Sequence, residues 1–375
     1  MGSDNELASV MLAAGGTGGH LFPAFALAEE LARRDVPVDL ITDMRGDRYG
    51  GKFPARRIYQ VPAATLAGSN PLSAARTIFT LAKGVKAARH ILAEVRPSVV
   101  VGFGGYPSFP PLVAASLMGL PTALHEQNAV LGRANRMLAR RVTAIATSFE
   151  TVRRLEGAAA AKAHFTGNPV RDVVIEWAGA AYRTSGPGEP FRLLVFGGSQ
   201  GARFFSEAVP PALRLLPEPL RQRLRVIQQA RPEDEAAVRA AYAEAPALAA
   251  TIAPFFDNLP ELMAASHLVI ARAGASTVAE LAVLGRPSLL VPLPHALDND
   301  QLANATRLAD AGGAICREQS DLTPDKIAEV VAFAMESPAK VAAAAEAAAT
   351  QGRPDAVQRL ADLVLGLKVG ASTTA

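Results

Sequence analysis

Residues 10–31 read VMLAAGGTGGHLFPAFALAEEL: an apolar strand-like run, a double-glycine turn and then a helical pattern. Residues 192–210, RLLVFGGSQGARFFSEAVP, repeat that order. The turn glycines Gly15 and Gly197 are 197 − 15 = 182 positions apart, a separation of domain size. A strand that passes through a glycine turn into a helix is the opening unit of a doubly wound α/β sheet. We therefore predict two related doubly wound domains that face each other across a cleft.

Short apolar runs alternate with longer helical patterns along nearly the whole chain, on both sides of a polar, Pro- and Gly-rich stretch at residues 167–190. Runs that are apolar throughout are typical of parallel strands, which are buried on both faces. The predicted strands are residues 8–13, 38–42, 99–102, 122–124, 142–147, 192–196, 224–228, 268–271 and 288–291. We predict an N-terminal domain at residues 8–166, completed by a C-terminal helix at 355–367, and a C-terminal domain at 167–350.

Composition and charge narrow the class of protein. A length of 375 residues favours two domains, and 50% hydrophobic with 19% charged residues excludes disordered and low-complexity classes. The basic excess is only 38 − 35 = 3, which gives no sign of nucleic-acid binding. A single cysteine, Cys316, favours a reducing compartment. No apolar run reaches the roughly 18 residues that cross a bilayer, and residues 1–10 do not read as a signal peptide.

Three predicted strands run into glycine-rich loops, at residues 15–20 (GGTGGH), 102–108 (GFGGYPS) and 197–202 (GGSQGA). Glycine lets the backbone approach a ligand closely, and the start of the following helix offers N–H groups and partial positive charge. Together the loops predict phosphate binding. None has the G-x-G-x-x-G spacing of dinucleotide-binding domains, and the near P-loop at residues 46–52 has Phe53 where a Mg²⁺-binding Ser or Thr belongs.

Polar residues gather just after several predicted strands. His20 follows the first glycine loop, where a group that titrates near neutrality can accept a proton from a hydroxyl. Residues 125–128 (HEQN) offer four hydrogen-bonding side chains suited to a sugar. Residues 274–276 would start a helix whose N–H groups face a phosphate, with Glu280 about one turn further, placed to accept two ribose hydroxyls. Residues 298–300 (DND) are similar to a metal-binding D-x-D, but acidic residues at a helix start are the favoured interpretation.

Seven ordered segments carry a more specific signal than any single loop: GGTGGHLFPAFALAEEL, GFGGYPSFPP, HEQNAVLGRANRMLA, GNPVR, FGGSQGA, ARAGASTVAEL and DNDQLANA. They run from residue 8 to about residue 310, and weaker similarity continues to about residue 367. In these segments the chain resembles the MurG family of GT-B glycosyltransferases. The resemblance implies an α/β protein of two doubly wound, parallel-sheet, Rossmann-like domains.

The family resemblance implies a reaction in peptidoglycan synthesis. GlcNAc would pass from UDP-GlcNAc, with inversion, to the C4 hydroxyl of MurNAc in undecaprenyl-pyrophosphoryl-MurNAc-pentapeptide (lipid I), giving lipid II and UDP. No cofactor or metal would be required, and no nucleic acid would bind. The resemblance also implies a peripheral protein on the cytoplasmic face of the bacterial inner membrane, with cell-wall and division proteins as potential partners and roles in cell shape, cell division and the cell cycle.

The resemblance also assigns site residues. For UDP-GlcNAc it implies Thr17, Gly18, Gly19, Asn128, Arg171, Ser199, Phe256, Ala275, Ser276, Thr277, Val278, Ala279, Glu280 and Gln301. Within that set, Ser199 would hold the phosphates, the Phe256 backbone the uracil and Glu280 the ribose. The acceptor pyrophosphate would lie on the N-terminal glycine loops, at Gly104, Gly105 and Tyr106. Inversion needs one base, for which His20 is the first candidate and Glu126 the second.

A lipid acceptor requires a route to the bilayer, and residues 72–93 offer one as an amphipathic helix after a start signal at residues 69–71. One helical face is apolar and is expected to pack on the sheet: Ile78, Leu81, Val85, Ala88 and Leu92. The other side mixes apolar and basic side chains, which suits an anionic lipid surface: Leu72, Arg76, Phe79, Lys83 and Lys86.

Two other functions stay open at the level of sequence. A GT-B sugar-nucleotide epimerase would need UDP-GlcNAc but neither a lipid acceptor nor a basic, apolar helix face. A non-catalytic, nucleotide-sensing scaffold of the cell-wall machinery would bind UDP-GlcNAc and would tolerate the loss of His20.

Overall fold

The computed structural model describes residues 9–15, 18–43, 53–64 and 71–370, and these form two units. The first unit comprises Met1–Arg171 together with Asp355–Ala375, and the second comprises Asp172–Pro354. The division therefore lies five residues after the expected boundary at residues 166–167. The C-terminal segment belongs to the first unit, where the sequence analysis placed it.

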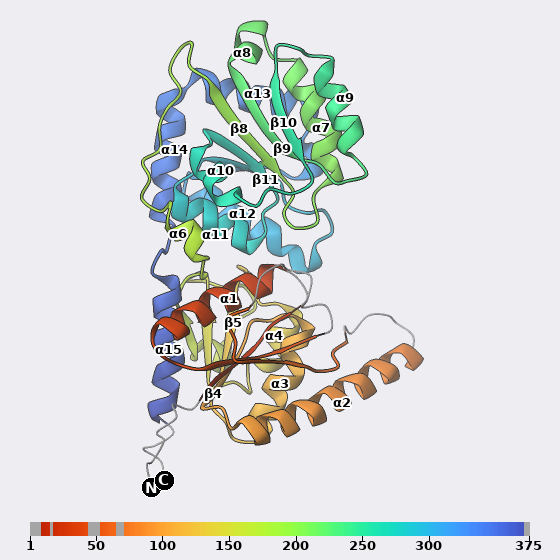
Figure 1. Ribbon diagram of the computed structural model, residues 1–375, viewed down its shortest axis with the longest axis vertical. Helices are drawn as coiled ribbons and strands as arrows, with labels where there is room; N and C mark the ends of the chain where they lie inside the picture. The colour runs from red at the N-terminus through yellow and green to blue at the C-terminus, as the bar shows by residue number, and fades with distance from the viewer. Residues whose placement is uncertain (1–8, 16–17, 44–52, 65–70, 371–375) are drawn as a thin grey trace. The chain divides into compact units, whose positions relative to one another are not determined.

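The first unit is built on a seven-stranded parallel sheet with the order β3-β2-β1-β4-β5-β6-β7. Its strands are β1 (Val10–Ala13), β2 (Val38–Thr42), β3 (Arg57–Gln60), β4 (Val99–Gly102), β5 (Thr122–Glu126), β6 (Ala144–Thr147) and β7 (Ala163–Phe165). Its helices are α1 (Gly18–Arg33), α2 (Pro71–Val95), α3 (Gly105–Leu117), α4 (Arg133–Leu138), α5 (Gly157–Ala160) and α15 (Ala356–Gly370). Val10 and Leu12 pack on the side of α1 and α15, while Met11 packs on the side of α2 and α3, so helices cover both faces (Figure 1).

The second unit has a six-stranded parallel sheet with the order β10-β9-β8-β11-β12-β13, which is the same winding as in the first unit. Its strands are β8 (Phe191–Phe196), β9 (Leu224–Gln229), β10 (Ala249–Ala253), β11 (Leu268–Ala271), β12 (Ser288–Leu290) and β13 (Ala314–Cys316). Its helices are α6 (Asp172–Ile175), α7 (Arg203–Arg214), α8 (Glu218–Arg223), α9 (Glu235–Ala243), α10 (Leu259–Ala265), α11 (Ala275–Leu284), α12 (Asp300–Asp310), α13 (Pro324–Glu336) and α14 (Pro338–Thr350), with short 3-10 turns at Leu297–Asn299 and Gln319–Asp321. Two Rossmann-like domains of the predicted α/β class are thus confirmed.

The nine predicted strands all form, and four further strands were not expected from the sequence: β3, β7, β10 and β13. Each of these four is the outermost strand of its sheet. An outermost strand pairs on one side only and carries exposed residues, so it lacks the continuous apolar run that marks a central parallel strand. β3 (RIYQ), for example, is largely exposed, whereas every residue of β1 is buried.

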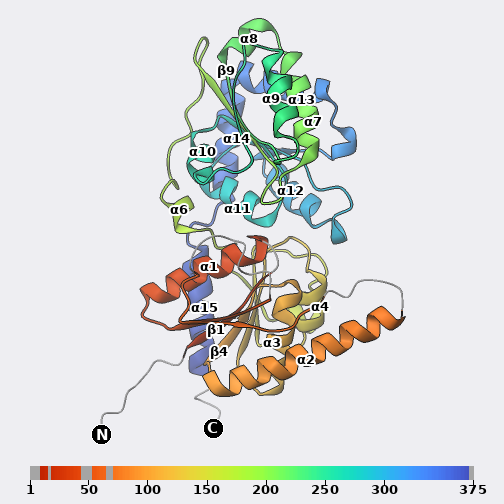
Figure 2. The ribbon, with the colours of Figure 1, turned by 45° about the vertical axis from the view of Figure 1, so that its right-hand side comes forward.

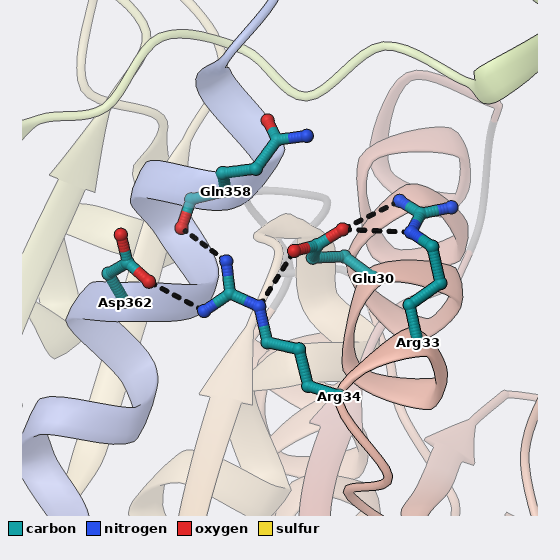
Figure 3. A network of polar contacts seen from close by, with 5 residues as sticks. All are labelled: Glu30, Arg33, Arg34, Gln358 and Asp362. Atoms are coloured by element: carbon teal, nitrogen blue, oxygen red, sulfur yellow. Dashed lines mark hydrogen bonds and ion pairs between the residues drawn. The ribbon is translucent and has the colours of Figure 1, made fainter.

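The C-terminal helix α15 is held on the first unit by apolar and polar contacts. Leu360 and Val364 are fully buried in the same core as Leu27 and Leu31 of α1. Arg34, just after α1, donates to the carboxylate of Glu30 at 2.7 Å and to that of Asp362 at 2.5 Å (Figure 3). These two acceptors raise the pKa of the Arg34 guanidinium. The last segment of the chain therefore completes the first domain.

The long helix α2 packs on α3 through one face, as Leu81, Ala88 and Leu92 are buried. Gly84 belongs to this face, since a Cβ there would lie 2.1 Å from the carbonyl oxygen of Pro62. The expectation that Ile78 is buried is wrong, because its side chain is 62% exposed. Figure 2 shows that the first turns of α2 extend beyond α3, and the side chains described there, from residue 74 to residue 80, are exposed or half-buried. No helix among the described residues is both long and apolar enough to cross a bilayer.

Candidate functional site

Both sheets reverse their winding direction at one place, between β1 and β4 in the first unit and between β8 and β11 in the second. At such a switch point the loops on either side run in opposite directions and leave room for a ligand at the carboxyl ends of the strands. The glycine loops found in the sequence follow β1, β4 and β8, and the ARAGAS segment follows β11. The fold therefore brings the predicted loops to the ligand-binding edge of each sheet.

In the first unit, His20 lies in the first turn of α1 and packs against the turn that follows β4. A Cβ on Gly104 would lie 3.4 Å from Cε1 of His20, and one on Gly105 would lie 3.1 Å from Cδ2. Both glycines have positive φ, +81° and +68°, a backbone region that L side chains rarely adopt. These two positions need glycine both for the turn and for the imidazole ring that lies on it.

The imidazole of His20 contacts a buried side chain of the HEQN segment. Its Nδ1 lies 3.2 Å from Oε1 of Gln127, which is 1% exposed. The Gln127 amide nitrogen in turn lies 3.0 Å from Nδ1 of His125, and His125 Nε2 lies 3.2 Å from the carbonyl oxygen of Gly167. Burial lowers the pKa of His125 to about 4, so this residue is neutral at physiological pH. The sequence analysis assigned Gln127 and His125 to sugar binding as part of the HEQN segment and did not foresee the hydrogen bonds that link them to His20.

Glu126 is buried and serves as a four-fold acceptor. Its Oε1 accepts from the backbone and side-chain nitrogens of Asn128 at 2.9 and 3.2 Å. Its Oε2 accepts from the Gly132 N–H at 2.9 Å and from Asn135 at 2.7 Å. Burial raises the pKa of Glu126, and the four donated bonds act against that rise. With its lone pairs directed at the segment 128–135, this carboxylate holds a loop and is a poor candidate for the base.

The expectation that all four HEQN side chains face a sugar is wrong for three of them. His125, Glu126 and Gln127 are each at most 1% exposed and bond within the protein. The physical reason is that β5 continues to Glu126, two residues beyond its predicted end, into a sheet covered on both faces. Asn128, by contrast, is half-buried and remains near the surface.

A small pocket of about 370 Å³ lies beside the β4 loop, lined by Tyr106, Arg133, Arg136 and Met137. Tyr106 was an expected acceptor-site residue, whereas the two arginines of α4 were not expected. Both belong to the segment HEQNAVLGRANRMLA, so the signal was their spacing of three on a helix, which places them on one face. The pocket thus places the guanidinium groups of Arg133 and Arg136 near the N-terminus of α3, where the N-cap residue Gly104 provides no side-chain cap.

The second unit presents a different kind of surface at its switch point. The two ends of the loop after β8 approach closely at Gly197, where a Cβ would lie 2.3 Å from the Ala202 nitrogen. The Gly197 N–H donates to Oε1 of Gln229 at 2.9 Å. Ser199 is exposed at the tip of the loop, and α7 begins after Ala202 with no side-chain cap. A helix start without a side-chain cap, next to an exposed hydroxyl, suits a phosphate.

The same arrangement recurs after β11. Helix α11 begins at Ala275 behind Gly274, which supplies no side-chain cap, and the buried hydroxyl of Ser276 has no hydrogen-bond partner among the described residues. The rest of the expected donor segment fills the first turns: Ser276, Thr277 and Ala279 are half-buried, and Ala275, Val278 and Glu280 are buried. Glu280 is 6% exposed and lies in the second turn.

The remaining expected donor residues are divided between the two units. Gln301, in the first turn of α12, accepts from the Leu293 N–H at 2.9 Å, and Phe256 is half-buried beside the exposed Phe255. Arg171 stacks on the ring of Phe22 at 4.4 Å. Gly18 is buried and Gly19 is exposed at the start of α1. Thr17 lies outside the described residues, as does the near P-loop at residues 46–52.

The D-x-D-like segment forms the turn into α12. Asp298 and Asn299 adopt positive φ, +63° and +52°, within the short 3-10 turn. Asp300 begins α12, and its carboxylate accepts from the Gln301 N–H at 2.7 Å. This geometry agrees with the favoured interpretation, acidic residues at a helix start.

Comparison with known proteins gives one consistent result. Residues 10–147 match the glycosyltransferase family 28 N-terminal domain, and residues 192–360 match its C-terminal domain. The chain is 53% identical over 361 residues to a protein of Allorhizobium ampelinum named UDP-N-acetylglucosamine–N-acetylmuramyl-(pentapeptide) pyrophosphoryl-undecaprenol N-acetylglucosamine transferase, with 96% of each chain covered. A Brucella abortus protein of the same name is 52% identical over 361 residues, covering 96% of this chain and 94% of its own.

Solved structures agree. MurG of Acinetobacter baumannii is 30% identical, with a TM-score of 0.78 and coverage of 96% of this chain and 99% of that one. A UDP-GlcNAc 2-epimerase of Neisseria meningitidis has a TM-score of 0.65 at 13% identity, over 95% of this chain and 100% of that one, and so shares the fold alone. The chain belongs to glycosyltransferase family 28, within the MurG group of N-acetylglucosamine transferases.

Proposed function

We propose that this protein transfers GlcNAc from UDP-GlcNAc to the MurNAc of undecaprenyl-pyrophosphoryl-MurNAc-pentapeptide, converting lipid I to lipid II. The observation that carries the proposal is the 53% identity with a transferase of that name over 96% of both chains. The two switch-point loops with uncapped helix starts in the second unit, and the histidine above the glycine turn in the first, support it.

The second unit is the proposed donor domain. The diphosphate of UDP would accept from N–H groups at the starts of α7 and α11, with Ser199 and Ser276 as hydroxyl donors. Glu280 would accept the two ribose hydroxyls and the Phe256 backbone would hold uracil, while Gln301 and Asn128 would bind the sugar. Because N–H groups and helix dipoles neutralise the departing diphosphate, the transfer is proposed to need no metal.

The first unit is the proposed acceptor domain. His20 would take the proton of the MurNAc C4 hydroxyl as that oxygen bonds to the anomeric carbon and the bond to the diphosphate breaks, with inversion. The acceptor pyrophosphate would lie at Gly104, Gly105 and Tyr106, next to the arginines of the α4 pocket. His20 is favoured over Glu126, because the carboxylate of Glu126 already accepts four hydrogen bonds.

We also propose that α2 docks the protein on an anionic membrane surface. Ile78 and Phe79 are 62% and 60% exposed, and the Lys83 ammonium lies 4.5 Å from the Phe79 ring centre. Arg76 and Lys86 are exposed on the same helix. Exposed apolar side chains among cations suit the headgroup region of a bilayer. Because nucleotide sugars are made inside the cell, the cytoplasmic face of the inner membrane is the proposed location.

The transfer proposal is tested with radiolabelled UDP-GlcNAc and a short-chain lipid I analogue, in the presence of EDTA. Wild-type protein is expected to form labelled disaccharide-lipid, and His20→Ala is expected to lose most of it. Label appearing as UDP-ManNAc with none in lipid would favour an epimerase instead. Nucleotide binding without any turnover would favour a scaffold, and a requirement for added metal would refute the metal-free transfer.

The membrane proposal is tested by sedimentation with vesicles containing anionic lipid. Phe79→Ser combined with Lys83→Glu is expected to reduce the bound fraction strongly, whereas Lys326→Glu, on the exposed surface of the second unit, is the matched charge control. Equal binding of wild type and the double variant would contradict docking through α2.

A further inference from the structure

The orientation of the Gln127 amide decides which groups donate and which accept in the hydrogen bonds that involve His20. The Gln127 amide nitrogen lies 2.9 Å from the carbonyl oxygen of Phe103 and 3.2 Å from that of His125. A carbonyl oxygen only accepts hydrogen bonds, so the amide nitrogen must face these two groups. The opposite amide orientation would place three oxygens together inside the protein, at a site that is 1% exposed. The Gln127 oxygen therefore faces His20.

The orientation of Gln127 determines which nitrogen of His20 carries the proton. The ring nitrogen 3.2 Å from the Gln127 oxygen is Nδ1, and beside an acceptor it must be the N–H donor. A neutral imidazole has one N–H, so Nε2 holds the lone pair. An Nε2 lone pair is what a general base needs, and the other tautomer would have its basic nitrogen directed at Gln127.

His125 supports the same direction from the opposite side. Its Nδ1 lies 3.0 Å from the Gln127 nitrogen and accepts from it, while its Nε2 donates to the Gly167 carbonyl at 3.2 Å. A neutral His125 with its proton on Nε2 therefore satisfies both contacts: Nδ1 accepts from Gln127 and Nε2 donates to Gly167. A doubly protonated His125 would oppose an N–H to the amide N–H of Gln127, and burial disfavours that form.

The ring of His20 is also fixed in position. It lies on the turn at Gly104 and Gly105, where Cβ atoms would lie 3.4 and 3.1 Å from its carbon atoms. With the turn on one side and Gln127 at Nδ1, the rotation of the ring about its Cβ–Cγ bond is defined. The Gln127 oxygen also stabilises the positive charge that His20 acquires on taking a proton, since its dipole points at Nδ1–H.

We infer that Gln127 and His125 are positioning residues that hold His20 in the Nδ1–H tautomer, which puts the ring's lone pair on Nε2. The proton would move from the hydroxyl oxygen to His20 Nε2, the oxygen electron pair would form the new glycosidic bond, and the diphosphate would leave with the electrons of the broken bond. His20 would then return the proton to water. The role in proton transfer rests on the proposed function, whereas the tautomer does not.

The direct test is the nitrogen NMR spectrum of ¹⁵N-histidine-labelled full-length protein, with the His20 signals assigned by their loss in His20→Ala. The expected wild-type spectrum near pH 8 shows a protonated Nδ1 and an unprotonated Nε2 for His20, and the reverse for His125. An Nε2–H tautomer at His20 would overturn the inference, and it would do so whether or not the protein turns over substrate.

Variants extend the test to activity. Gln127→Met keeps the length of the side chain but removes its donor and acceptor, and it is expected to lower kcat about 10- to 100-fold, with the KM for UDP-GlcNAc changed less than about twofold. The His20 signals should change to a mixture of tautomers. In its protonated form Gln127→Glu can still donate to the Phe103 carbonyl and accept from Nδ1–H, so it is expected to recover the tautomer and part of kcat, which a merely structural role of Gln127 would not predict.

The outcomes separate the two proposals. Absence of transfer by the wild type would refute the proposed function and leave the tautomer as measured. Transfer by the wild type, together with unchanged kcat and an unchanged His20 tautomer in Gln127→Met, would refute the positioning role. If Gln127→Met does not fold, the wild-type spectrum and His125→Phe, which keeps the bond from Gln127 to Phe103, decide the same question.

Discussion

The two sheets have the same strand order, but the residues at their carboxyl ends differ in how they are hydrogen-bonded. In the first unit the key side chains bond to one another: Gln127 contacts His20 and His125, and Glu126 accepts four hydrogen bonds. In the second unit the starts of α7 and α11 have no side-chain cap, and the buried hydroxyl of Ser276 has no hydrogen-bond partner among the described residues. The same fold thus holds a side chain in a fixed orientation at the carboxyl end of the first sheet and suits an anion at the carboxyl end of the second.

The difference indicates a division of labour. A proton acceptor needs a defined tautomer and orientation, which require buried partners. A diphosphate needs several donors at once, which helix N-termini provide through the backbone. Chemistry is therefore assigned mainly to side chains of the first unit, and donor affinity mainly to the backbone and a few side chains of the second. Four predictions test this assignment.

The largest effect is expected for His20→Ala. Loss of the base should lower kcat by about 10² to 10⁴-fold while leaving UDP affinity within about twofold, because the imidazole is proposed to contact the acceptor hydroxyl and not the nucleotide. The measurement is steady-state transfer combined with UDP titration. His164→Ala, an exposed histidine on β7, is the control and should behave as wild type. Retention of kcat in His20→Ala would remove the chemical role of the first unit.

The second effect concerns stability against pH. His125 has a folded-state pKa of about 4, below its usual 6.5, so the unfolded chain binds its proton first as the pH falls. The stability that neutral His125 provides is present above about pH 6.5 and is lost as the pH falls towards 4, by roughly 3 kcal/mol. Urea unfolding of wild type and His125→Phe should show wild type losing stability relative to the variant over that range. A constant difference would mean that His125 is not held neutral.

The third effect is on donor binding. Glu280→Gln should weaken UDP binding by about 10- to 100-fold, because a charged acceptor contributes more than a neutral one. The value of kcat at saturating donor should change much less. Calorimetric titration with UDP measures the first quantity, and Glu329→Gln, exposed on α13, is the control. Unchanged UDP affinity would argue against the second unit as the donor site.

The smallest effect tests the completion of the first unit by α15. Arg34→Ala removes the contacts to Glu30 and Asp362 and should lower the free energy of unfolding of the first unit by about 1 kcal/mol or less, because the pair is partly exposed. Arg359→Ala, which breaks an exposed pair with Asp355 just before α15, should cost less still. If both variants unfold as wild type does, apolar packing at Leu360 and Val364 alone holds the helix.

Much of this arrangement could be predicted from the sequence, because central parallel strands are apolar throughout and glycine turns mark their carboxyl ends. Strands at sheet edges could not, since a strand such as β13 (AIC) is short and half-buried. The HEQN segment shows a different limit. Polar residues after an apolar run suggest an exposed loop, yet His125 and Glu126 belong to β5 and are buried. Their burial depends on hydrogen bonds to residues that are distant in sequence, such as Gly167 and Asn135.

Ile78 is the opposite case, an apolar residue that was expected to be buried and is exposed. Its position on the apolar face of α2 predicted burial, but a helical pattern does not reveal where the partner helix ends. The site residues predicted from the glycine loops and the start of α11 lie where parallel-strand topology puts them, at the switch points. Gln127 was missed because its role depends on contacts with residues 24 and 107 positions away.

The division of labour is tested most directly by measuring two quantities on two variants, UDP affinity and kcat at saturating substrates for His20→Ala and Glu280→Gln. We expect that His20→Ala loses kcat and keeps UDP affinity, and that Glu280→Gln loses UDP affinity and keeps most of kcat. If both substitutions lowered the same quantity, or if the pattern were reversed, the assignment of chemistry to the first unit and donor binding to the second would be contradicted.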